Sequence, residues 1–113
     1  MIIEQSEVKG LTTDLYHLDK AADSIGFVRW QWEYNRATYD YKIVHNSQEF
    51  YLRVNTRVTE GKMESPDTLL VLEDAYIGVT TFPHGLDYNS PIPDPVLQAS
   101  KQKLTELKKK LSA

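Results

Sequence analysis

The residues with the clearest capacity for chemistry are His84 and Asp87, which lie close together in the segment PHGLDY. A histidine beside an aspartate can transfer protons as an acid–base pair or supply two ligands to a metal ion. The segment is rich in turn formers and predicts a loop, and loops carry many functional groups. A turn fixed by Pro83, Gly85 and the Asp87 carboxylate explains the same residues without a ligand, and we favour that interpretation.

The sequence contains no other recognisable motif for catalysis or metal binding. The chain has no cysteine, which excludes thiolate chemistry and Cys-type metal sites. It also has no Gly-rich phosphate loop, no nucleophile elbow and no zinc-binding His-Glu-x-x-His motif. We therefore expect no catalytic residue, no metal site and no cofactor. The sequence favours a non-enzymatic protein without excluding an enzyme.

Two arginines, Arg53 and Arg57, occupy polar positions of a predicted strand. Guanidinium groups bind carboxylate or phosphate bidentately, which makes the pair a candidate anion site. Asp40 and Glu33 are predicted nearby, however. Ordinary surface ion pairs, worth about 0–1 kcal/mol each, explain the arginines as well, and we favour them.

The segment WQWEYNRATYDYKI contains five aromatic rings in fourteen residues. Apolar and polar residues alternate through it, which is typical of a strand with one buried face. We therefore expect Trp30 and Trp32 in the core, and Tyr34 and Tyr39 partly exposed near the end of the sheet. In the alternative, a ligand pocket is lined by Tyr34, Tyr39, His84 and Asp87.

Two helices must hold these residues in place, at about residues 12–25 and 95–111. In the first, apolar residues recur every three or four positions, Thr12 or Thr13 suits the N-cap, and Gly26 suits a left-handed C-terminal cap. In the second, Asp94 is the expected N-cap. A narrow apolar seam then predicts packing on the domain's own sheet in preference to a second copy of the chain. The seam repeats every seven residues, at Leu97, Leu104 and Leu111.

A sheet is expected between the helices, at about residues 27–82. A two-residue turn at Asn46–Ser47 predicts pairs whose numbers sum to 93, with Asp40 opposite Arg53. The preceding turn leaves two registers open, with sums of 71 and 73. Both put the tryptophans on the apolar face.

The remaining strands are expected at about 68–73 and 75–82, followed by a loop at about 83–93. The predicted fold class is α+β, with a single antiparallel β-sheet of about five strands covered by an N-terminal and a C-terminal helix. We expect residues 1–113 to form one domain, a size that folds without disulfides.

Charge and hydropathy limit the classes of partner. The net charge is −3, and the last twenty residues carry five lysines against two carboxylates, so the rest of the chain is acidic. An acidic body disfavours nucleic acid. No apolar run is long enough to span a membrane and no signal peptide is visible, so we expect a cytoplasmic protein.

The order of several short motifs resembles the YugN-like proteins of Bacillus-type bacteria. The resemblance implies a small cytoplasmic α+β domain and does not supply a reaction. We therefore expect a binding or protein-interaction domain. Its partner is another protein or a second copy of the chain bound through the C-terminal helix. The alternative is a small-ligand carrier or enzyme with a pocket near Tyr39, His84 and Asp87. The motifs are Gly26–Phe27, Trp32–Asn35, Thr38–Lys42, Phe50–Val54, Thr59–Pro66 and Phe82–Tyr88.

Overall fold

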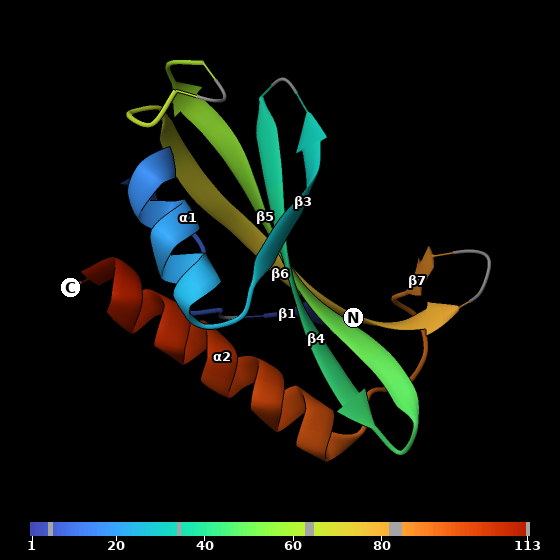
Figure 1. Cartoon of the computed structure of the whole chain (residues 1–113). Coiled ribbons are helices and arrows are strands. Elements are labelled where there is room, and N and C mark those ends of the chain that lie inside the picture. Colours follow the sequence, from blue (N-terminus) through green and yellow to red (C-terminus); the bar gives the residue numbers. More distant parts are fainter. Residues whose placement is uncertain (5, 34, 63–64, 82–84, 113) are drawn as a thin grey trace.

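The computed structural model describes residues 1–4, 6–33, 35–62, 65–81 and 85–112, and for residues 30–33 it describes the backbone alone. Figure 1 shows a twisted sheet with both helices against one of its faces. The elements in chain order are β1 (Ile2–Ile3), β2 (Thr12–Asp14), α1 (Leu15–Ser24), β3 (Val28–Glu33), β4 (Arg36–His45), β5 (Gln48–Glu60), β6 (Leu69–Thr81), β7 (Gly85–Asp87) and α2 (Asp94–Ser112).

Within the described residues the sheet has seven antiparallel strands, so the expected number of about five was too low. Five strands follow one another in the order β1-β6-β5-β4-β3, and β2 and β7 also pair with β6. The segments predicted as two strands at 68–73 and 75–82 form the one long strand β6. The first helix does not open the fold, because β1 and β2 precede it. The added strands have two or three residues each, too few for an alternating pattern.

The β4–β5 hairpin confirms the predicted register. Asp40 pairs with Arg53 and Ile43 pairs with Phe50, as a sum of 93 requires. Asn46 and Ser47 form the turn with φ values of 49° and 65°. Positive φ at both central residues is typical of the type I′ turn, whose twist matches that of the strands it joins.

The β3–β4 hairpin differs from both predicted registers. Trp32 pairs with Ala37, a sum of 69, and the register shifts between Arg29 and Gln31. The extra residue of this bulge exchanges the two faces of the strand before it. Val28, predicted on the apolar face, is therefore 62 % exposed, while Phe27 is buried. The side chains of Trp30 and Trp32 lie outside the described part, so their place in the core stays a prediction.

Helix α1 is shorter at its start than predicted, because Thr12 and Thr13 belong to β2. Asp14 is the N-cap, and its carboxylate accepts the His17 N–H at 2.8 Å. At the other end Gly26 has a φ of 96°, as a left-handed cap requires. Its N–H and that of Phe27 donate to carbonyls of the last turn at 3.2 and 3.0 Å, which completes a Schellman motif.

Helix α2 begins one residue earlier than predicted. The Pro93 carbonyl accepts the N–H groups of Val96 and Leu97, both at 3.0 Å, so Asp94 lies in the first turn rather than at the N-cap. The side chains that face the domain are buried, whereas Leu97 and Leu111 of the predicted seam are only partly buried. The four buried residues are Val96, Ser100, Leu104 and Leu107.

One of the C-terminal lysines has a structural role. The Lys103 Nζ donates to the Ile25 carbonyl at 3.2 Å and lies 4.5 Å from the centre of the Tyr41 ring. A cation is favoured at a helix C-terminus and over an aromatic face. Lys103 therefore ties α2 to the end of α1 and to β4.

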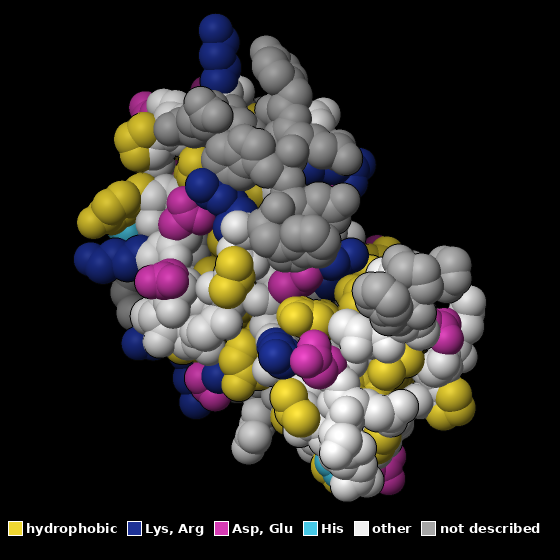
Figure 2. All heavy atoms as spheres, turned by 45° about the vertical axis from the view of Figure 1, so that its right-hand side comes forward, with side chains coloured by type: hydrophobic (Ala, Val, Ile, Leu, Met, Phe, Trp, Pro, Cys, Tyr) yellow, Lys and Arg dark blue, Asp and Glu magenta, His cyan; other side chains and the backbone are white. Residues whose placement is uncertain are grey.

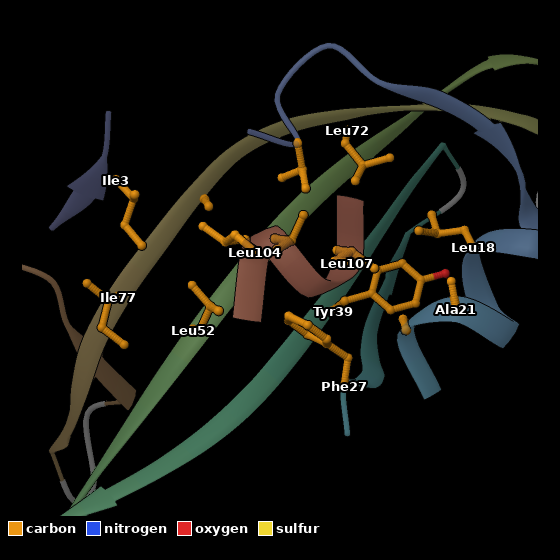
Figure 3. Close-up of a cluster of buried hydrophobic side chains, with 14 of the residues drawn as sticks. Ile3, Leu18, Ala21, Phe27, Tyr39, Leu52, Leu72, Ile77, Leu104 and Leu107 are labelled. Carbon is orange, nitrogen blue, oxygen red and sulfur yellow. The ribbon is translucent and has the colours of Figure 1, made fainter. Parts of the chain in front are cut away.

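The core lies between the helices and one face of the sheet, which we call the inner face. Figure 3 shows side chains of α1, α2, β4, β5 and β6 converging there. Neither α1 nor α2 combines the length and the hydropathy needed to cross a bilayer, and the described part of the chain has no other helix. Fully buried inner-face side chains include Tyr39, Leu52, Leu72, Ile77, Leu104 and Leu107.

Replacing the N-cap Asp14 by alanine is expected to lower the free energy of unfolding by about 1 kcal/mol at pH 7. The backbone N–H of His17, followed by its side chain, lowers the pKa of Asp14. A lowered pKa means that the stabilisation is complete above the ordinary value of about 3.9 and is lost as the pH falls below it. Urea unfolding of wild type and Asp14→Ala at several pH values checks this. A difference that grows on acidification would contradict it.

Candidate functional site

A buried ion pair lies at the centre of the sheet face turned away from the helices, which we call the outer face. Asp40 and Arg53 alternate along their strands with core residues and are directly paired. Arg53 is also opposite Tyr76 of β6, and Asp40 is opposite Val28 of β3. The ion pair is therefore flanked across the sheet by an aromatic and an aliphatic residue.

The geometry of this pair is bidentate. The Nε and one terminal nitrogen of Arg53 each donate to a different Asp40 oxygen at 2.9 Å. The Asp40 side chain is 5 % exposed and that of Arg53 is 15 % exposed. The Asp40 hydrogen bond, ahead of its charge, raises the pKa of Arg53. The sequence predicted this pairing but placed it in water, and the burial corrects that expectation.

The side chain of Tyr88 contacts the pair on the outer face. Its hydroxyl accepts a hydrogen bond from the second terminal nitrogen of Arg53 at 2.9 Å. Its ring lies 5.6 Å from the ring of Tyr76. Gly78 makes this close approach feasible, because a Cβ at that position would lie 3.1 Å from both the Asp87 carbonyl oxygen and the Tyr88 ring. The side chain of Tyr88, which follows β7, thus lies on the outer face over β6.

A groove of about 1080 Å³ adjoins the buried pair on the outer face. One wall is formed by Gly26, which precedes β3, and by Val28 at its start, and the other is formed by β7, with Gly85 and Leu86. Such a volume is close to the upper end of the range of natural ligand sites, which combine apolar walls with a few fixed polar groups. The floor carries Asp40, Lys42, Glu49, Tyr51 and Arg53.

The charges in and around the groove are balanced. Lys42 and Glu49 form an exposed pair at 3.4 Å, next to the buried pair. Figure 2 shows basic and acidic side chains side by side among hydrophobic ones on this face, rather than a field of one sign. The groove is therefore suited to an uncharged, amphipathic group.

A second hollow, of about 830 Å³, lies between α1 and β3. Tyr39 donates its hydroxyl to Asp19 at 2.6 Å, and Arg29 donates to the other oxygen of the same carboxylate at 2.9 Å. Burial, reinforced by the Asp19 hydrogen bond, raises the pKa of Tyr39 strongly. The phenol is therefore a hydrogen-bond donor rather than an acid at neutral pH.

A model of the YugN-like family matches residues 4–111 of the chain. The chain belongs to the YugN-like family. The uncharacterized protein YlbA of Bacillus subtilis (strain 168) is 33 % identical over 100 residues, 88 % of this chain and 83 % of that protein. The crystal structure of the uncharacterized conserved protein YugN from Geobacillus kaustophilus HTA426 is similar with a TM-score of 0.86 at 30 % identity, covering 99 % of this chain and 95 % of that one.

The family assignment confirms the resemblance seen in the sequence. Both of these relatives are described as uncharacterized, so the assignment brings a fold without a reaction.

Two of the four residues predicted to bind a ligand, Tyr34 and His84, lie outside the described part. Tyr39 faces the inner side and is 2 % exposed, which corrects the expectation that it is partly exposed. Asp87 lies on β7, where Ser90 and then the Asn89 N–H lower its pKa in a local turn. The structure does not bring Tyr39 and Asp87 to one pocket. Their role in binding stays a prediction.

The position of Tyr88 over the outer face was not predicted from the sequence. Tyr88 contacts Arg53 from a distant part of the chain, so no local spacing reveals it. Gly78 was the available signal, because an isolated glycine inside a strand pattern indicates a close approach of other backbone. The second predicted arginine, Arg57, is half exposed and contacts Glu73 at 3.4 Å, as an ordinary surface ion pair would.

Replacing Gly78 by alanine is expected to lower the free energy of unfolding by about 1–3 kcal/mol, because the new methyl group overpacks against β7 and Tyr88. Thermal unfolding measures the loss, and amide hydrogen exchange should show faster opening of β7 than of β4. Lys101→Ala, at an exposed position of α2, is the control, with a change within about 0.5 kcal/mol. An unchanged exchange rate in β7 would contradict the role assigned to Gly78.

Proposed function

We propose that this YugN-like protein is a small cytoplasmic binding domain without catalytic activity, and that it binds a protein partner through the outer-face groove. The observation that carries the proposal is the groove beside the Asp40–Arg53 pair. A rigid floor with satisfied polar groups keeps its shape without a ligand, and pre-organisation lowers the cost of binding.

The charge pattern supports a protein partner over nucleic acid. Phosphate backbones are bound mainly by unpaired lysine and arginine. In the groove Lys42 has Glu49 beside it and Arg53 is held by Asp40. Protein interfaces instead combine apolar contacts with a polar rim, which fits walls that contain Val28 and Leu86.

The groove is tested by a ¹⁵N NMR titration with a library of uncharged amphipathic fragments and short peptides. We expect shifts that cluster at Lys42, Tyr51 and Leu86, and a loss of these shifts in Tyr51→Ala. Tyr16→Ala is the matched control, because Tyr16 borders the other hollow. Binding that is lost in the Tyr16 variant and kept in the Tyr51 variant would contradict the choice of groove.

A second candidate function is a small-ligand carrier or enzyme that uses the hollow at Tyr39. The supporting observation is the Asp19 carboxylate, which is held between Tyr39 and Arg29 and borders the hollow together with both of them. Such an anchored carboxylate orients a ligand that donates hydrogen bonds. Asp19→Asn should then abolish fragment shifts around α1 and leave those at Tyr51 unchanged.

A further inference from the structure

The two edges of the sheet differ in how completely they are paired. The edge of β6 that does not face β5 pairs with β2, β1 and β7, one after another along its length. On the opposite side β3 pairs with β4 only as far as Asp40. The last five residues of β4, Tyr41–His45, have no partner strand on that side within the described part of the chain.

The hairpin geometry decides which groups this edge presents. Across a two-residue turn the flanking residues, here His45 and Gln48, form a hydrogen-bonded pair, and such pairs alternate along the ladder. Ile43 therefore bonds to β5, whereas Lys42 and Val44 direct their N–H and C=O groups away from it. No loop backbone in the described part bonds to these groups.

Exposed apolar side chains lie at both ends of the same gap. Val28 and Val44 are each 62 % exposed, the highest values among the large hydrophobic residues described. Both are on the outer face, because Val28 pairs with Asp40 and Val44 is four residues farther along β4. A strand added beside Val44 would continue the line of β3 and cover both valines.

We infer that an extended segment of a partner protein pairs with the free edge of β4 and places an apolar side chain between Val28 and Val44. Strand addition uses the backbone for affinity and alternate side chains for specificity. The groove beside this edge is lined by Val28 and Lys42 and would accept those side chains. The inference rests on the proposed function and names the kind of partner.

A peptide fits this edge better than a second folded copy does. An edge of five residues offers far less than the roughly 1,000 Å² expected of a stable interface between folded proteins. A flexible segment avoids that limit, because it can continue from the edge into the groove. Because Lys42 and Glu49 pair with each other, the bound peptide need not carry a charge.

The test uses a displayed library of random peptides selected on the wild-type protein. Selected peptides are then measured on Val44→Pro, which lacks the outward N–H, and on Val44→Thr, which keeps it. We expect proline to weaken binding about tenfold or more and threonine to leave it within about threefold. Proline is tolerated on edge strands where the N–H faces solvent, and circular dichroism checks that the variant folds.

A second measurement keeps the test decisive if Val44→Pro does not fold. On wild-type protein, bound peptide should slow the hydrogen exchange of the Val44 and Lys42 amides and leave that of Ile43 unchanged, because Ile43 already bonds to β5. Unchanged exchange at Val44 would overturn the inference.

The outcomes separate the inference from the proposed function. Peptides that bind Val44→Pro normally but no longer bind Tyr51→Ala would contradict strand pairing at the β4 edge and support binding in the groove. Peptides that no longer bind Val44→Pro but bind Tyr51→Ala normally would support pairing at the edge and contradict binding in the groove. A library without any enriched peptide overturns the inference, and so does concentration-dependent self-association that protects the Val44 amide, because the edge would then belong to a second copy.

Discussion

The variant Arg53→Met is expected to lower the free energy of unfolding by about 3–5 kcal/mol. Removal of the guanidinium leaves the Asp40 carboxylate 5 % exposed without its bidentate partner. A buried charge that loses its partner costs far more than the pair contributed, because the ion remains desolvated. Tyr88 loses its hydrogen-bond donor in the same variant. Urea unfolding followed by circular dichroism measures the change.

Two controls give this result its meaning. The double variant Asp40→Leu with Arg53→Met should recover most of the lost stability, because an apolar pair has no charge to desolvate. The exposed pair on the same face, Lys42 and Glu49, should cost at most about 1 kcal/mol when Lys42 is replaced by methionine. If Arg53→Met and Lys42→Met had equal effects, the pair on the outer face would be an ordinary surface ion pair.

The sequence predicted the Asp40–Arg53 pairing because hairpin register is a local property. A two-residue turn and an alternating pattern determine every pair between β4 and β5. Burial of the pair is not a local property, because it depends on Tyr88, which follows the distant strand β7. Periodicity indicates which face a residue occupies and gives no account of what later covers that face.

The β3–β4 hairpin shows the reverse case, in which a local rule fails. One extra residue between Arg29 and Gln31 exchanges the faces of the residues before it, so an alternating sequence pattern led to the wrong side for Val28. That exposed valine borders the groove proposed for binding. The departure from regular alternation thus lies at the candidate site, where sequence rules are expected to fail most often.

The apolar seam of α2 predicts packing on the domain's own sheet in preference to a second copy. Periodicity at Leu104 and Leu107 specifies a face without specifying its neighbour, so the preference rests on the width of the stripe, which usually serves the domain's own core. In the structure both residues belong to the domain's own core. The prediction of a dimer through this helix remains untested, and its strongest apolar positions are used within the chain.

Leu104→Ala is the second variant with a large expected effect, a loss of about 2–5 kcal/mol in the free energy of unfolding. Leu104 is 2 % exposed, so the truncation leaves a cavity that the surrounding helix and strands can fill only partly. The exposed neighbour Gln102→Ala should change stability by less than about 0.5 kcal/mol.

The concentration dependence of Leu104→Ala decides where the seam packs. Because the side chain lies in the domain's own core, the melting temperatures of wild type and variant should both stay constant over a hundredfold range of protein concentration, with the same difference throughout. A seam between two copies behaves otherwise, since mass action raises the melting temperature of a dimer with concentration. A wild-type melting temperature that rises with concentration, together with a monomeric variant that melts at one fixed temperature, would place Leu104 in an interface and contradict its assignment to the core.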